Sequence, residues 1–159
     1  MMPEGAGKTR WRIRLFHLFF LLARPMTLGV RAIVHDGARG SVFLVRHTYV
    51  PGWQLPGGGV EPGESADQAL ARELAEEGNI RLTGPARLVS FHFNRLASRR
   101  DHVALYLVDT FEQVGPRGRD HEIAETGFFA LDNLPEETTR ATRARLEEVF
   151  GSAVRSPFW

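Results

Sequence analysis

Alternating apolar and polar positions predict several short strands in this chain. Residues 28–34 and 42–45 are apolar runs separated by Asp36-Gly37 and Gly40, a pattern typical of a hairpin with a buried inner strand. Further strand patterns cover residues 86–94, 103–111 and 128–131. Short strands at this density indicate a sheet as the centre of the fold.

Two segments have helical periodicity instead. Residues 65–77 have apolar positions at helical spacing, and Ser65 with Gln68 fits a capping box at the start. Residues 135–150 predict a closing helix, because Leu146, Val149 and Phe150 share one face. Strands wrapped around a central helix, with helices at the ends, indicate a mixed α/β sandwich.

Composition narrows the class of protein. The 159 residues, 43% of them hydrophobic and 25% charged, fit one globular domain with a sizeable core. A formal net charge of +1 gives the chain no overall positive charge for binding duplex nucleic acid, so no such partner is expected. The chain has no cysteine, which excludes disulfides, thiolate metal sites and a cysteine nucleophile, so any metal must be held by oxygen or imidazole.

The N-terminus is basic and then apolar. Residues 1–31 hold six basic residues and one acidic residue, and Arg10, Arg12 and Arg14 precede the apolar run 15–23. This layout resembles a secretion signal, but no small-residue cleavage site follows, and the run is shorter than the roughly 20 residues that span a bilayer. A cytoplasmic protein is therefore expected.

The interpretation we favour for this segment is a helix over residues 10–25, ended by Pro25. Its apolar face is expected to be covered by the domain or by a second copy of the chain, so a homodimer is an open alternative. Membrane contact through this helix is a further interpretation, less favoured than cover by the domain or by a second copy. The chain then divides into a helical extension, residues 1–25, and a domain, residues 26–159.

The densest chemical signal lies between Trp53 and Ile80. Five glutamates fall within 17 residues there: Glu61, Glu64, Glu73, Glu76 and Glu77. On an ideal helix the last three share an arc of roughly 100°, so they form one acidic patch beside the apolar stripe. Like charges at this spacing destabilise a helix, and a cation should compensate.

A hard divalent ion is the simplest source of the positive charge that the patch needs, since Mg²⁺ binds carboxylate and carbonyl oxygen and bridges to phosphates. The plainer alternative is a solvated acidic helix face. The preceding Gly57-Gly58-Gly59 favours the ion site, because glycine lets backbone approach a ligand closely.

The spacing Gly58, Glu64, Arg72-Glu73-Leu74-Ala75-Glu76-Glu77 and Asn79-Ile80 resembles the signature of the Nudix hydrolases. The match covers 23 residues and differs at one fixed position, Asn79, where the family has glycine. That glycine ends the helix in a left-handed conformation, which asparagine tolerates best among other residues, so a positive φ is predicted for Asn79. Less specific similarity extends over roughly residues 28–150.

The resemblance implies an α/β/α sandwich with a mixed sheet and a central catalytic loop and helix. It implies hydrolysis of a nucleoside diphosphate linked to another group, with Mg²⁺ or Mn²⁺ as cofactor. Glu73, Glu76 and Glu77 match the metal-binding positions, with the carbonyl of Gly58 as a further ligand. Arg72 matches a position that supports the loop and helix.

The remaining roles are less constrained by the resemblance. Glu64 matches the partner of that arginine, and Glu76 or Glu77 could take a proton from the attacking water, with Glu122 as a further candidate. Candidate substrate contacts are Arg46, Trp53, Phe93 and Arg95, each of which could equally be core or ordinary surface. A ligand sensor on the same fold, without turnover, is the alternative function.

Overall fold

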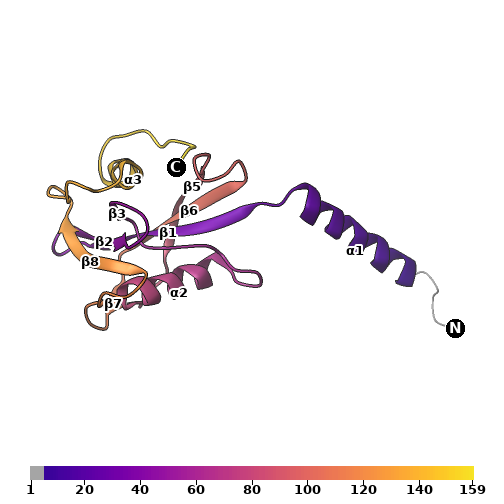
Figure 1. The fold of residues 1–159 in the computed structure, drawn as a ribbon, viewed down its shortest axis with the longest axis horizontal. Helices are drawn as coiled ribbons and strands as arrows, with labels where there is room; N and C mark the ends of the chain where they lie inside the picture. The colour runs from indigo at the N-terminus through magenta and orange to yellow at the C-terminus, as the bar shows by residue number, and fades with distance from the viewer. Residues whose placement is uncertain (1–5) are drawn as a thin grey trace.

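The computed structural model describes residues 6–159, without the side chains of residues 6–10, 12 and 14. A mixed sheet forms the centre of the domain, and one long helix stands apart from it (Figure 1). The strands of the main sheet are β1 (Thr27–Asp36), β2 (Ser41–His47), β3 (Trp53–Gln54), β5 (Arg87–Phe93), β6 (Asp101–Val108) and β8 (Ile123–Ala130). The helices are α1 (Ala6–Ala23), α2 (Ala66–Gly78) and α3 (Arg140–Phe150).

The main sheet has the order β3-β2-β1-β6-β5, with β8 also paired to β2. β1 and β6 are parallel along most of their length, whereas β1 and β2 pair only at His35–Val42 and Asp36–Ser41. The hydrogen bonds of β1 that β2 does not take are used by the loop before α2. Val30 N donates to Gly58 O at 2.8 Å, and Val60 N donates to Leu28 O at 2.8 Å.

The two faces of the sheet carry separate cores. Leu70 and Leu74 of α2 pack with Val30 and other buried residues on one face. Leu146 of α3 packs with Ile33 on the other face. Helices therefore cover both faces, and the expected α/β/α sandwich is confirmed.

Both ends of α2 form as predicted. The Ser65 side chain accepts a hydrogen bond from Gln68 N, and the Gln68 side chain accepts one from Ser65 N, which completes the capping box. Asn79 has φ 51° and ψ 33°, so the predicted left-handed C-cap is confirmed. Its N–H donates to Ala75 O at 3.1 Å, which satisfies one of the last carbonyls of the helix.

Three element boundaries were predicted wrongly. The closing helix begins at Arg140 rather than near residue 135, because segment 137–139 pairs with Trp53 through two backbone hydrogen bonds of 3.0 Å. The strand expected over 103–111 divides into β6 and β7 (Phe111–Gln113), and β7 pairs with β4 (Ile80–Leu82) in a separate sheet. β8 is longer than the strand expected at 128–131, since it pairs with all of β2.

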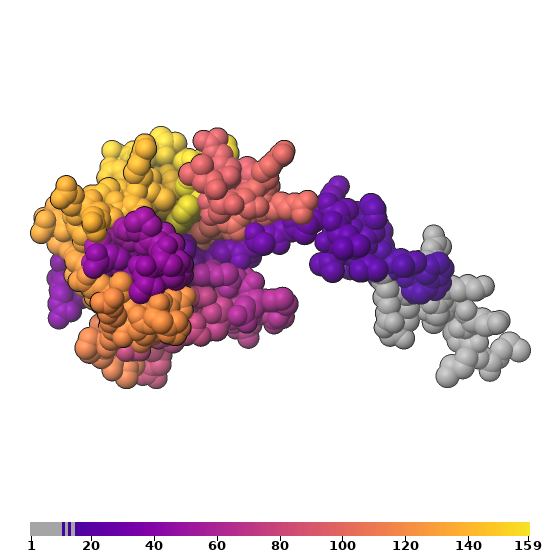
Figure 2. All heavy atoms as spheres, in the orientation of Figure 1, coloured from indigo at the N-terminus to yellow at the C-terminus, as the bar shows by residue number. Residues whose placement is uncertain are grey.

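The predicted N-terminal helix is present as α1, but the domain does not cover it. Phe16, Phe19 and Leu22 are 62%, 63% and 73% exposed, and Figures 1 and 2 show α1 extending away from the sheet. Of the two expected covers of the apolar face, the domain is therefore ruled out, and a second copy of the chain stays a prediction. In the part of the chain that the structure describes, no helix is long and apolar enough to cross a membrane.

Candidate active site

The glycines before α2 bring the backbone against both the sheet and the helix. Gly57 has φ 137°, and a Cβ there would lie 2.1 Å from Val30 O. A Cβ on Gly58 would lie 2.3 Å from Glu73 Oε1. Neither position accommodates a side chain, so these glycines let the carboxylates of α2 reach the loop backbone.

Glu77 is the most deeply held carboxylate of the acidic patch. Its Oε2 accepts a hydrogen bond from Gly57 N at 2.7 Å, and its Oε1 lies 2.7 Å from His47 Nε2. Both Glu77 and His47 are buried. Sequence reasoning missed His47, because a histidine at the end of a strand carries no signal that it faces α2.

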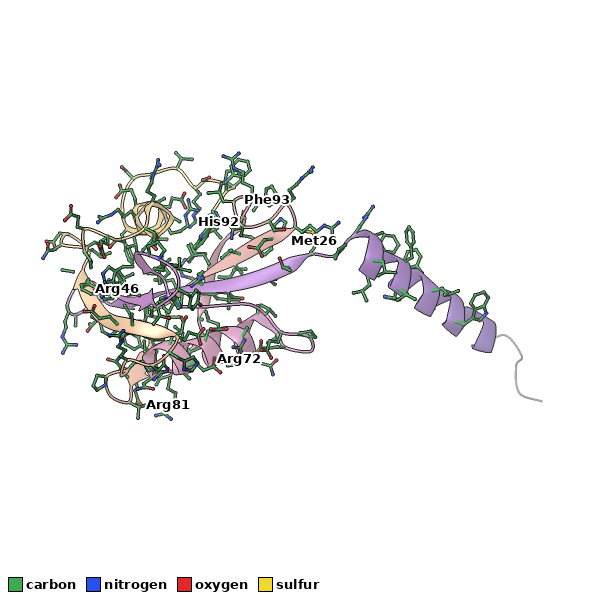
Figure 3. The ribbon with its side chains drawn as sticks, in the orientation of Figure 1. Met26, Arg46, Arg72, Arg81, His92 and Phe93 are labelled. Atoms are coloured by element: carbon green, nitrogen blue, oxygen red, sulfur yellow. The ribbon has the colours of Figure 1, made fainter. Side chains whose placement is uncertain are left out.

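Arg72 joins the loop to the helix. Its guanidinium donates to both carboxylate oxygens of Glu64, at 2.9 and 3.1 Å, and to Gly59 O at 3.0 Å. It also donates to Glu73 Oε1 at 2.8 Å and to Glu76 Oε2 at 3.4 Å. These bonds raise the pKa of Arg72, and the bond from Arg72 lowers the pKa of Glu64. Figure 3 shows Arg72 on α2.

Burial and neighbouring carboxylates both act on Glu73. Its pKa is raised, first by burial and also by the charges of Glu77 and Glu76, while Arg72 acts in the opposite direction. Glu73, Glu76 and Glu77 line one cavity of about 270 Å³ together with Glu122. The cavity therefore collects carboxylates from α2 and from the loop before β8.

Arg117 and Asp120 hold that loop beside α2. Arg117 Nε donates to Glu76 O at 2.7 Å, and the guanidinium pairs with Asp120. Backbone N–H groups of Ile123 and Glu122 donate to Asp120, and with Arg117 they lower its pKa to about 2. Sequence reasoning missed both residues, because their role depends on where the loop folds.

Tyr49 forms another contact to this loop. Its hydroxyl donates to Glu122 Oε1 at 3.4 Å, and its ring centroid is 5.3 Å from that of His47. The pKa of Tyr49 is raised, mainly by burial and then by the charge of Glu122. Glu122 thus faces the same region as the glutamates of α2.

The donor set fits a hard divalent cation, although the side chains are not gathered as ligands. Among the described residues, no group of three metal-ligating side chains is already arranged around one point. Five carboxylates nevertheless line the cavity with one arginine, Arg117, and Arg72 pairs with two of them from outside, so negative charge is in excess. Among the described residues Gly58 O accepts one backbone hydrogen bond, from Val30 N, and Gly57 O accepts none, so each carbonyl keeps a lone pair for a cation and Gly58 stays the predicted ligand.

The sequence profile of the NUDIX domain matches residues 25–150, which include the sheet, α2, α3 and the acidic cavity. The chain belongs to the Nudix family. The expected membership is confirmed, and the Nudix signature occupies residues 58–80, from Gly58 to the residue after Asn79.

Solved Nudix structures resemble the whole domain. The crystal structure of the MutT NUDIX hydrolase from Burkholderia pseudomallei has a TM-score of 0.65 and 32% identity, covering 77% of this chain and 97% of that one. An ADP-ribose pyrophosphatase from Streptococcus suis has a TM-score of 0.57 and 24% identity, covering 84% of this chain and 95% of that one. The second likeness shows the fold alone.

Curated relatives match over shorter segments. The RNA pyrophosphohydrolase of Nitrobacter winogradskyi is 45% identical over 56 residues, which are 35% of this chain and 32% of that protein. The chain matches 34%, 32% and 28% of the lengths of the first three curated relatives. Likeness over about a third of a relative's length does not carry that relative's substrate over to this chain.

The structure places the four predicted substrate contacts of this Nudix domain outside the acidic cavity. Arg46 pairs with Glu125 at 2.7 Å and lies away from Arg72 in Figure 3. Trp53 is buried in the core of the α3 face, so its ring is unsuited to stacking on a base. Phe93 stacks on His102, and the guanidinium of Arg95 lies over the Phe158 ring. None of the four lines the acidic cavity.

A larger cavity of about 580 Å³ lies on the other side of the glycine loop. Gly58 and Gly59 line it, together with Asn94, Asp101 and Trp159. Arg46 instead lines a third cavity, beside His47 and Tyr49. Sequence reasoning missed Trp159, because its place depends on the tail crossing β5.

Proposed function

We propose that this Nudix protein is a metal-dependent pyrophosphohydrolase that cleaves a nucleoside diphosphate linked to another moiety. The observation that carries the proposal is the shared cavity of Glu73, Glu76, Glu77 and Glu122 beside the glycine loop. A solvated acidic face would leave these side chains free, whereas Glu77 is buried and hydrogen bonded at both oxygens.

Glu73, Glu76 and Glu77 would hold Mg²⁺ or Mn²⁺, together with a backbone carbonyl of the glycine loop. When bound, the ion neutralises the diphosphate and lowers the pKa of a coordinated water. Arg72 keeps the loop and helix at a fixed separation through its bonds to Glu64 and Gly59. The chain thus supplies oxygen ligands from one helix and one loop whose separation is fixed.

Outside the three proposed metal ligands, Glu122 is the carboxylate of this cavity best placed to accept the proton of the attacking water. Both oxygens of Glu77 are engaged, by Gly57 N and by His47. Glu122 has only the 3.4 Å contact from the Tyr49 hydroxyl and is exposed at the cavity. A carboxylate with free lone pairs at the reaction site is the more effective general base.

The non-reacting part of the substrate is assigned to the 580 Å³ cavity behind Gly58 and Gly59. Asn94 donates one N–H to Asp101 at 2.8 Å and keeps its other N–H and its carbonyl for a ligand, and Trp159 supplies an aromatic surface. This combination suits a nucleoside, which needs stacking and a few polar contacts. The diphosphate would then lie across the glycine loop toward the acidic cavity.

A substrate panel with Mg²⁺ tests the proposal. The panel contains nucleotide sugars, ADP-ribose, dinucleoside polyphosphates, nucleoside triphosphates and 5′-triphosphorylated RNA, and chromatography measures nucleotide products. Glu76→Gln should lose at least about tenfold in turnover, because metal-assisted charge stabilisation supplies several kcal/mol. Glu76 suits this test because its side chain is 61% exposed and supports little of the fold.

Glu136→Gln is the matched control, since Glu136 is exposed and lies outside the three cavities described above. Glu148 would be a poor control, because its carboxylate is buried beside Arg145. Equal turnover in Glu76→Gln and Glu136→Gln would refute the metal site. Tight binding across the panel without product would support a ligand sensor instead of an enzyme.

A further inference from the structure

α1 exposes apolar side chains around its whole circumference. Residues two positions apart on a helix point roughly 160° away from each other. Phe16 and Leu18 are such a pair, and so are Phe19 and Leu21, yet all four are more than half exposed. The apolar surface is therefore not a stripe on one side of the helix.

This distribution of apolar side chains favours a lipid layer, rather than a protein surface, as the partner of α1. A protein surface, whether the domain or a second copy of the chain, covers one side of a helix and would leave the other side in water. A lipid layer covers every side of a helix that enters it, provided that the backbone groups are hydrogen bonded within the helix. The helical hydrogen bonds of α1 extend to Arg24, whose N–H donates to Phe20 O at 2.8 Å.

The distribution of charge along the chain favours binding of α1 to an anionic lipid surface. Arg10, Arg12 and Arg14 precede the apolar run of α1, and Arg24 follows it. Residues 1–31 carry a formal charge of +5, which leaves −4 on the rest of the chain. An anionic surface would attract the helix and repel the domain, and arginine side chains extend from apolar surroundings to the headgroups.

The length of the apolar run in α1 limits how the helix can enter a bilayer. Leu15–Ala23 interrupts its apolar sequence only at His17, and at 1.5 Å per residue the run is about 14 Å long. This is about half of the ~30 Å hydrocarbon core of a bilayer, so an upright helix would place the arginines at one of its ends at the bilayer centre. We propose that α1 docks the protein on a membrane containing anionic lipid by lying along one leaflet, with residues 15–23 among the acyl chains, the arginines at both ends at the headgroups and the domain in water.

Vesicle sedimentation of the full chain tests this docking. We expect binding to phosphatidylcholine vesicles that contain phosphatidylglycerol, and at least about tenfold weaker binding to phosphatidylcholine alone. The triple variant Phe16→Ser, Phe19→Ser, Leu22→Ser should stay in the supernatant with an unchanged melting temperature, since α1 lies off the domain. The control triple Leu88→Ser, Leu96→Ser, Val154→Ser changes exposed apolar residues elsewhere and should still sediment.

Trp11 gives an independent readout, because it is exposed on α1. Its fluorescence should shift to the blue with phosphatidylglycerol vesicles, and Trp11→Phe should remove that shift. The proposal is overturned if the wild-type chain does not sediment with these vesicles, or if the two triple variants behave alike. A lipid-free dimer that the α1 triple variant dissociates, with no vesicle binding, would assign the helix to a second copy of the chain.

Discussion

His47 Nε2 lies 2.7 Å from Glu77 Oε1, and the two side chains are buried together between β2 and α2. The other oxygen of Glu77 is held by Gly57 N, so strand, loop and helix meet at one carboxylate. We infer that His47 positions Glu77 through this contact.

Replacing His47 tests this positioning role. His47→Ala should lower kcat by about tenfold or more with little change in KM, because losing one hydrogen bond to a charged group costs roughly 1.5–3 kcal/mol. His47→Gln should restore part of kcat, since its amide N–H can donate to Glu77. His35→Ala is the control, because His35 pairs with Asp109 away from the cavity. Equal losses in His47→Ala and His47→Gln would contradict positioning through a hydrogen bond.

Asn79 offers a test of backbone conformation. Asn79→Val should lower the free energy of unfolding by about 1–2 kcal/mol, because a β-branched residue is strained at φ 51°. Asn79→Gly should be close to neutral, since relief of strain offsets the lost bond from Asn79 Nδ2 to Pro116 O. Urea denaturation of the three proteins measures the difference, and an Asn79→Val protein as stable as wild type would rule out the left-handed cap.

Trp159 should affect substrate affinity more than turnover. On the panel substrate that is cleaved, Trp159→Ala should raise KM roughly fivefold or more, because stacking on a base contributes about 1 kcal/mol or more. Phe158→Ala is the matched control on the same tail, since Phe158 does not line the 580 Å³ cavity. Identical KM values in the two variants would show that the nucleoside does not bind in this cavity.

His92 should make stability depend on pH. Burial, and then the charge of Arg145, lower its pKa below the ordinary 6.5, so the folded state keeps it neutral. As pH falls below 6.5, the unfolded chain takes up a proton that the fold does not, and stability is lost until the pH reaches the folded pKa. Melting temperatures across this range should fall less in His92→Gln. An unchanged slope would mean that His92 is not the group responsible.

The ends of α2 show what the sequence could predict. The capping box of Ser65 and Gln68 and the left-handed Asn79 depend on residues close in sequence, and both predictions are confirmed. The acidic patch and its position beside the core followed from helical spacing in the same way. Local chemistry was enough for these elements.

Other features depend on contacts between distant residues. Segment 137–139 is not helical because it pairs with Trp53, and Trp53 is unavailable to a base because α3 and β8 bury it. Similarly, His47 and Trp159 are remote from the Nudix signature in sequence, and only the packing of β2 and of the tail brings them to the cavities. No local pattern could have shown these relationships.

The hydrogen bonds between β1 and segment 56–60 make the glycine-rich loop part of the sheet. Val30 N, Ala32 N and Val60 N all donate across this boundary. Their amide protons should therefore exchange with deuterated solvent at rates set by unfolding of the sheet rather than by local opening. An arriving diphosphate then meets backbone that is already ordered, so binding loses little conformational entropy despite three consecutive glycines.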